Sequence, residues 1–213
     1  YDEYGGDTLY LEFNDDYAPK GYTWSFPEGD GFTRWGNGIP LSLDASPSEH
    51  LESYLEDHDK DQWADTAREH TNAIIPTARP LESAVNGSVA LVGDTGHHCD
   101  PLHGGGILFG CRAGNAFGKA VARGGVQKYD KLWKDDFLDT IQHRFVLKDM
   151  IYAMDNKDFD ALIGALSSFE LTSLDPDTEI PRMMWHVFKQ DRSLFTETAA
   201  TATKSIVKEK LMI

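Results

Sequence analysis

The pattern of hydrophobic and polar positions predicts strands in the first 45 residues. Apolar and polar side chains alternate in Thr8–Phe13, in Gly21–Pro27 and in Ile39–Leu43. A period of two is typical of strands with one buried face, so Leu9 and Leu11 are expected to point inward. Glycines separate the three segments, and the pattern therefore predicts an antiparallel sheet with short turns.

Helical periodicity begins after this region. Ser46 to Glu49 has the form of a capping box with proline at the first helical position, which predicts a helix start. A long amphipathic helix is predicted from large apolar residues at four-residue intervals, namely Trp133, Phe137, Ile141 and Phe145. Further helices are expected at Asp61–His70, Gly105–Arg123, Phe159–Leu166 and Phe188–Lys208. Further strands are expected at Ala73–Ala78 and Ser88–Val92.

One segment combines a strand, an acidic tip and a glycine-rich helix start. The apolar run Val89–Val92 ends in Gly93-Asp94, which predicts a buried strand that presents a carboxylate. Pro101 and Gly104–Gly106 follow, so the backbone there can approach a ligand closely. The next helix directs free N–H groups toward the same place. This order of features indicates a cofactor-binding site.

Glycine also recurs every fourth residue within that helix, at Gly106, Gly110, Gly114 and Gly118. A glycine in a helix costs up to about 1 kcal/mol relative to alanine. Four such positions predict close packing of the helix, against a sheet or against a cofactor.

Composition narrows the class of protein. The net charge is −15, and residues 1–70 hold 17 acidic against 4 basic side chains, so a nucleic-acid partner is excluded. Asp outnumbers Glu by 23 to 12, which suggests a halophilic source. Two cysteines are too few for a disulfide framework, and neither a signal peptide nor an apolar run of membrane-spanning length is visible, so a cytoplasmic location is expected.

Two motifs resemble those of one flavoprotein family. Gly93-Asp94-Thr95-Gly96, followed by Asp100-Pro101-Leu102-His103-Gly104-Gly105-Gly106-Ile107, resembles the second FAD fingerprint of proteins with the aromatic-hydroxylase fold. Pro19-x-x-Tyr22-x-Trp24-x-Phe26-Pro27, then eight residues and Gly36-x-Gly38, resembles the motif lining the prenyl-chain pocket of geranylgeranyl reductases. The resemblance is therefore closest to those archaeal lipid-biosynthetic enzymes, which saturate isoprenoid double bonds.

The resemblance implies an α+β fold, the C-terminal part of an FAD/NAD(P)-binding flavoprotein. It implies three regions: a substrate-binding sheet region over 1–80, an FAD-binding strand, loop and helix over 81–124, and a helical region over 125–213. The implied FAD-binding residues are Gly93, Asp94, Pro101, Gly104, Gly105, Gly106 and Ile107, with Asp94 accepting hydrogen bonds from the ribityl chain. The implied substrate-binding residues are Tyr22, Trp24, Phe26, Pro27, Gly36 and Gly38.

The sequence departs from this family in one respect. The Gly-x-Gly-x-x-Gly motif that holds the FAD pyrophosphate does not occur in it. We therefore expect the chain to be the C-terminal portion of a longer or split protein, and the isolated chain to bind FAD weakly.

Several alternatives stay open at this level. The preferred function is reduction of geranylgeranyl double bonds in phospholipid precursors. The electron donor would be NADPH, ferredoxin or another reductant. The alternatives are a flavin monooxygenase or halogenase of the same fold, and a non-catalytic prenyl-binding remnant. The segment from His97 to His103 holds several potential metal ligands. No metal is expected, because these side chains would converge only on a helix, and a helix is unfavourable beside Pro101. Cys99 is a candidate proton donor. The basic and apolar C-terminus, Lys204 to Ile213, would allow peripheral membrane contact.

Overall fold

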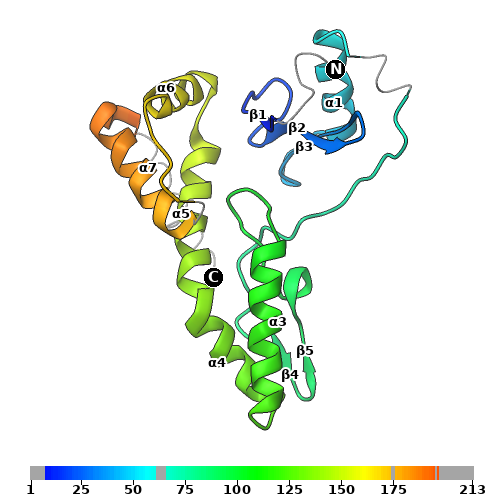
Figure 1. The fold of residues 1–213 in the computed structure, drawn as a ribbon, viewed down its shortest axis with the longest axis vertical. Coiled ribbons are helices and arrows are strands. Elements are labelled where there is room, and N and C mark those ends of the chain that lie inside the picture. The colour runs from blue at the N-terminus through cyan, green and yellow to red at the C-terminus, as the bar shows by residue number, and fades with distance from the viewer. Residues whose placement is uncertain (1–7, 61–65, 174–175, 195, 197–213) are drawn as a thin grey trace. The chain divides into compact units, whose positions relative to one another are not determined.

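The chain folds into two compact units, as a computed structural model that describes residues 8–60, 66–173, 176–194 and 196 shows (Figure 1). Unit 1 comprises Tyr1–Thr71 and Ile151–Ile213, and unit 2 comprises Asn72–Met150. Both contain helices and strands, so the expected α+β class is confirmed. The three-region division by residue number stays a prediction.

Unit 1 is built on an antiparallel sheet in the order β1-β2-β3, with strands Tyr10–Glu12, Tyr22–Gly29 and Phe32–Gly38. Successive side chains of β2 point to opposite faces. Thr23 and Ser25 are buried on one face. The aromatic side chains of β2 are half-buried on the other.

Two details of the predicted sheet are wrong. Leu9 and Leu11 do not point into a core, since Leu9 is 67% exposed and Leu11 is 54% exposed. The reason is that β1 is only a three-residue strand at the edge of the sheet. The third strand is not Ile39–Leu43, since β3 has already ended and Leu41 is 77% exposed. The chain turns back at once after β2, where Asp30 lies between two glycines of positive φ, and this tight turn fixes β3 as the return strand.

Helix α1, Pro47–Asp57, begins where the sequence predicts. The Ser46 Oγ accepts the backbone N–H of Glu49 at 3.4 Å. Tyr54 is buried, donates its hydroxyl to Glu12 at 3.0 Å and packs its ring 5.8 Å from that of Trp35 in β3. Capping and burial of one face together hold α1 against the sheet. The helix predicted over 61–70 is wrong for residues 66–70, which are not helical, while 61–65 lie outside the described residues.

Helices α6, Asn156–Leu166, and α7, Pro176–Gln190, complete the described part of unit 1. The α6 prediction is confirmed. Phe159 stacks on Phe13 at a centroid distance of 5.2 Å, and Asn156 accepts the Asp15 N–H at 2.9 Å. These contacts tie α6 to the segment that follows β1, more than 140 residues earlier in the chain. The helix expected over 188–208 lies mostly outside the described residues.

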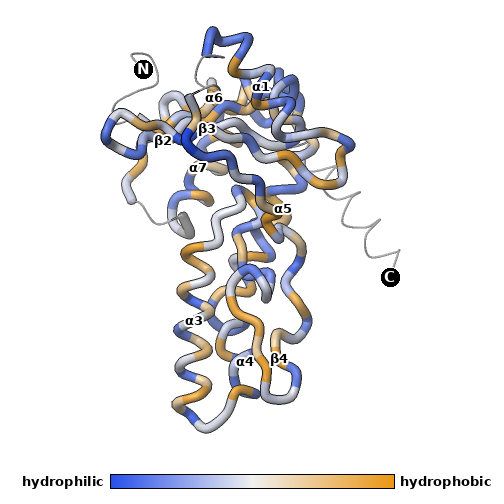
Figure 2. Tube along the Cα trace, turned by 90° about the vertical axis from the view of Figure 1, so that its right-hand side faces the viewer, coloured by the Kyte–Doolittle hydropathy of each residue, from blue (hydrophilic) through white to orange (hydrophobic). Residues whose placement is uncertain are grey.

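Unit 2 consists mainly of two helical segments and a small hairpin. Helix α3 is Ile107–Ala122, and α4, Tyr129–Trp133, continues through a π-helical turn, Lys134–Leu138, into α5, Asp139–Ala153. The four apolar residues that predicted the long helix, Trp133, Phe137, Ile141 and Phe145, are at most 4% exposed, which confirms it. Orange and blue positions alternate along α3 and α4 in Figure 2, as expected of helices that bury one face. Among the described helices, none is long and apolar enough to cross a bilayer.

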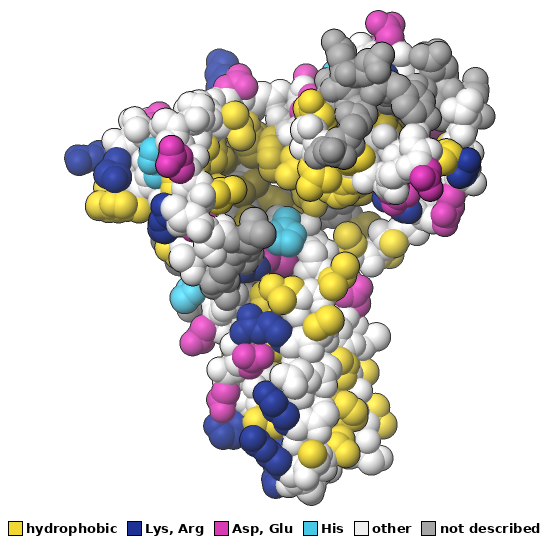
Figure 3. Space-filling view, in the orientation of Figure 1, with side chains coloured by type: hydrophobic (Ala, Val, Ile, Leu, Met, Phe, Trp, Pro, Cys, Tyr) yellow, Lys and Arg dark blue, Asp and Glu magenta, His cyan; other side chains and the backbone are white. Residues whose placement is uncertain are grey.

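The strands predicted in unit 2 are largely wrong. Residues 73–78 form no strand, and Ser88–Val92 contributes only β5, Val89–Ala90, which pairs with β4, Val85–Asn86. An apolar run becomes a buried strand only when strands flank it, and within the described residues β5 pairs with β4 alone. Val89 and Leu91 are consequently 60% and 37% exposed, and Figure 3 shows hydrophobic side chains on the surface of this unit.

Candidate functional site

The acidic turn and the glycine-rich helix start come together in unit 2. Gly93–Gly96 forms a 3₁₀ turn directly after the hairpin, and the Asp94 side chain is exposed on it. A Cβ built on Gly106 would lie 2.8 Å from Oδ1 of Asp94, so any side chain at residue 106 would displace this carboxylate. A Cβ on Gly110 would lie 3.9 Å from the Cα of Gly93. Glycine at the start of α3 therefore lets the Asp94 carboxylate lie against the helix N-terminus.

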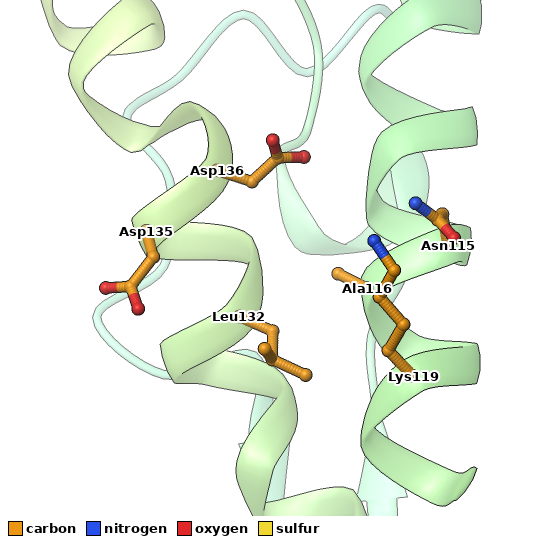
Figure 4. Close-up of a pocket in the computed structure, with 6 residues that line it drawn as sticks. All are labelled: Asn115, Ala116, Lys119, Leu132, Asp135 and Asp136. Carbon is orange, nitrogen blue, oxygen red and sulfur yellow. The ribbon is translucent and has the colours of Figure 1, made fainter. Parts of the chain in front are cut away.

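The glycine stripe of α3 has two different halves. Gly106 and Gly110 pack on the turn, whereas Cβ atoms on Gly114 and Gly118 would meet nothing within 4 Å. The predicted close packing is thus confirmed for the first half only. A shallow pocket opens between α3 and α4, lined by Asn115, Ala116, Lys119, Leu132, Asp135 and Asp136 (Figure 4). It includes none of the residues predicted to bind a cofactor.

The loop between the turn and α3 is closed by its own backbone. Asp100 donates its N–H to the Gly105 carbonyl at 3.0 Å, and Gly104 donates to the Asp100 carbonyl at 2.9 Å. Pro101 is fully buried, and Gly104 has a φ of +76°, which favours glycine. Helix α3 begins at the end of this loop with Gly106 as its N-cap and without a side-chain cap. Its first N–H groups are the kind that bind an anionic group.

A buried carboxylate anchors the loop. Asp100 is 1% exposed and pairs with the guanidinium of Arg144, which is 4% exposed in α5. Its Oδ2 also lies 3.0 Å from Nε2 of His103, and its Oδ1 accepts the Leu102 N–H at 2.9 Å. Burial raises the pKa of Asp100, but the His103 hydrogen bond and the Arg144 charge outweigh it, so the pKa is lowered overall. Asp100 is therefore a charged, fully bonded anchor.

The other potential ligands near the loop point in different directions. His97 donates its Nδ1–H to the Arg79 carbonyl at 3.0 Å, while His98 is buried among aromatic rings. Within the described ranges, no group of three or more His, Cys, Asp or Glu side chains could hold a metal. Cys99 is 2% exposed and burial raises its pKa to about 11, which makes the thiol inaccessible and a weak acid. The geometry does not support the predicted proton-donor role of Cys99.

The second motif forms one aromatic face on the sheet of unit 1. Trp24 lies opposite Gly36, and Tyr22 lies opposite Gly38. A Cβ built on Gly36 would lie 2.3 Å from Cζ2 of Trp24, so the indole lies flat across β3 where glycine leaves room. The rings of Tyr22 and Trp24 are 5.6 Å apart, and those of Trp24 and Phe26 are 6.2 Å apart. The spacing of the motif thus corresponds to the pairing of β2 with β3, which brings each glycine opposite an aromatic residue.

Each set of predicted residues converges within its own unit. Asp94, Pro101, Ile107 and the glycines lie together in unit 2, and the aromatic residues, Pro27 and the paired glycines lie together in unit 1. Sequence reasoning missed Arg144. Its signal was a charged residue three positions after Ile141, on the apolar stripe of a predicted amphipathic helix, where a buried ion pair is the usual explanation.

Comparison with known proteins relates these features to one family. A model described as the geranylgeranyl reductase catalytic domain matches residues 2–74. A digeranylgeranylglycerophospholipid reductase of Methanococcoides burtonii is 26% identical over 95% of this chain and 52% of its own length, and one of Methanothrix thermoacetophila is 28% identical over 88% and 52%. The crystal structure of a geranylgeranyl bacteriochlorophyll reductase-like protein from Thermoplasma acidophilum matches with a TM-score of 0.69 at 20% identity, covering 90% of this chain and 50% of that one.

The fold is accordingly one half of a geranylgeranyl reductase-like protein. The chain is similar to the geranylgeranyl reductase family, whose catalytic-domain model matches its first third, and to the digeranylgeranylglycerophospholipid reductases. It spans about half the length of the curated relatives it matches.

Proposed function

We propose that this chain is part of an FAD-dependent reductase that saturates isoprenoid double bonds of membrane-lipid precursors. The observation that carries the proposal is the close approach of the Asp94 carboxylate to Gly106 at the start of α3. The proposal also draws on the names of the archaeal relatives, which are lipid reductases.

The residues of unit 2 fit a flavin. Asp94 would accept hydrogen bonds from hydroxyls of the ribityl chain, because its carboxylate is exposed and ionised groups make strong acceptors. The uncapped N-terminus of α3 would stabilise negative charge on the ring system. Pro101 and Gly104–Gly106 would shape the contact surface, and Ile107, 87% exposed, would supply an apolar contact. When bound and reduced, FAD supplies the hydride for alkene reduction.

The aromatic face of unit 1 fits an isoprenoid chain. Tyr22, Trp24 and Phe26 are only half-buried, so they offer aromatic surface to an apolar partner. Each CH₂ group buried on such a surface contributes about 0.8 kcal/mol. Gly36 and Gly38 would keep the wall flat by leaving the indole of Trp24 unobstructed. Pro27 would limit movement of β2 at the end of the wall.

The test uses the complete polypeptide that contains this chain. It is expected to hold FAD, and with dithionite as reductant it should add pairs of hydrogens to a geranylgeranylated lipid, as read by mass spectrometry. Asp94→Asn should weaken FAD binding about tenfold, the usual cost of a lost charge-assisted hydrogen bond. Asp135→Asn, an exposed carboxylate of the same unit, is the matched control.

Two results would refute this function. A complete polypeptide without flavin, or one whose flavin affinity ignores Asp94→Asn, contradicts the cofactor site. Incorporation of oxygen in place of hydrogen would identify a flavin monooxygenase instead.

A further inference from the structure

His103 makes two hydrogen bonds that define its protonation state. Its Nδ1 lies 3.2 Å from the backbone nitrogen of Gly105, and its Nε2 lies 3.0 Å from Oδ2 of Asp100. A backbone N–H can only donate, so Nδ1 must be the acceptor and carry no hydrogen. Nε2 then carries the hydrogen and donates it to the carboxylate. This pattern of donor and acceptor corresponds to the Nε2–H tautomer of the ring.

These bonds join the two ends of the loop. The Asp100 carboxylate holds the ring, and the ring holds Gly105, which already accepts the Asp100 N–H through its carbonyl. A Cβ on Gly105 would lie 2.4 Å from Cε1 of His103, so the imidazole lies directly against the backbone there. The Gly105 N–H and C=O are thus both engaged by this arrangement.

Arg144 fixes this arrangement to the helical core. Its guanidinium pairs with Asp100 and lies 5.3 Å from the centre of the Phe109 ring in α3. Both charged side chains are almost fully buried, whereas the His103 side chain is 55% exposed at the edge of the loop. The loop therefore has a rigid inner end and an accessible outer end.

We propose that Asp100 and His103 form a clasp that fixes Gly104–Gly106 in the conformation that receives the flavin. Both are positioning residues, and they act through the direction of the glycine backbone groups. This inference rests on the proposed FAD site.

Three substitutions of His103 separate the two halves of the clasp. Asparagine places its Oδ1 near the position of Nδ1 and can accept the Gly105 N–H in a local turn. Glutamine reaches Asp100 but lacks an acceptor at that position, and alanine lacks both. His143→Ala, an exposed histidine of α5, is the control.

The measurements are hydrogen exchange at residues 100–106, FAD affinity of the complete polypeptide, and ¹⁵N NMR of labelled histidine. His103→Ala and His103→Gln should each speed exchange at Gly105 and weaken FAD binding about tenfold, as for one lost hydrogen bond. His103→Asn keeps the bond to Gly105 and loses only the bond to Asp100, so its exchange rate and FAD affinity should lie between those of wild type and His103→Ala. The control should stay near wild type, and NMR should show the Nε2–H form.

The possible failures are distinguishable. A wild-type polypeptide that binds no FAD overturns the proposed function, and with it the assignment of the clasp to cofactor binding. Tight FAD binding that is equal in wild type and in His103→Ala overturns the clasp alone. An Nδ1–H or doubly protonated His103 also overturns it, as does unchanged exchange at Gly105 in His103→Ala.

Discussion

The buried histidine beside the acidic turn should make unit 2 sensitive to mild acid. His98 is fully buried, its ring lies 4.7 Å from Trp133 and 5.5 Å from Phe137, and its Nε2 has no hydrogen-bond partner. Its Nδ1 is 3.4 Å from the Tyr129 hydroxyl. A second proton would create a buried charge with an unpaired N–H, and burial accordingly lowers the pKa of His98 from 6.5 to about 4.

The sign of the effect follows from proton counting. Between these two pKa values the unfolded chain binds a proton at His98 and the folded chain does not, so stability is full above pH 6.5 and falls toward pH 4. The shift corresponds to about 3 kcal/mol in total, of which about 2 kcal/mol should be lost between pH 7 and pH 5. Paired carboxylates such as Asp100, whose pKa is lowered, lose their contribution at lower pH.

Urea unfolding at pH 7 and pH 5 measures this loss. Trp133, the one tryptophan of unit 2, contacts His98, so its fluorescence reports on the site. His98→Leu should remove the loss of about 2 kcal/mol between the two pH values, whatever its effect at pH 7. His143→Leu, at an exposed position of the same unit, should keep it. An equal pH dependence in wild type and His98→Leu would refute the reasoning.

Four further substitutions test packing around the site. Arg144→Leu leaves the Asp100 carboxylate buried without its guanidinium partner and should cost about 3–5 kcal/mol in unfolding free energy, and Asp100→Leu should cost less in that background than in the wild type; additivity of the two changes in chemical denaturation would contradict the ion pair. Gly106→Ala should displace the exposed Asp94 carboxylate, because its methyl group would overlap Oδ1, and should leave the stability of unit 2 near that of the wild type. Gly114→Ala, in open space on the same helix, should instead stabilise by up to about 1 kcal/mol, and thermal unfolding that ranks the two alanine variants the other way would refute the assigned packing.

The elements that sequence reasoning predicted well depend on local signals. The cap at Ser46 and the four-residue repeat from Trp133 to Phe145 need no distant partner to define a helix. The strand predictions for residues 73–78 and 88–92 were largely wrong because a strand forms only when it can pair with neighbouring strands. An apolar run in the sequence does not show whether such strands are present. Arg144 was missed for a similar reason, since its partner Asp100 lies 44 residues away.

The two motifs were more informative about the candidate sites than the predicted helices and strands were, because the motif residues contact one another in the fold. Among the glycines predicted to bind the cofactor or the substrate, three would place a Cβ within 3 Å of a large or charged side chain: Gly36 against Trp24, Gly106 against Asp94, and Gly105 against His103. In each pair, the absence of a Cβ on the glycine leaves room for a side chain that would form part of a ligand surface. Substitution of the glycine would move that side chain even if the fold survived. The spacing of these glycines therefore reflects the shape of the candidate cofactor surface in unit 2 and of the aromatic face in unit 1. For this reason the short motifs revealed the resemblance to the reductase family, whereas much of the predicted strand pattern was wrong.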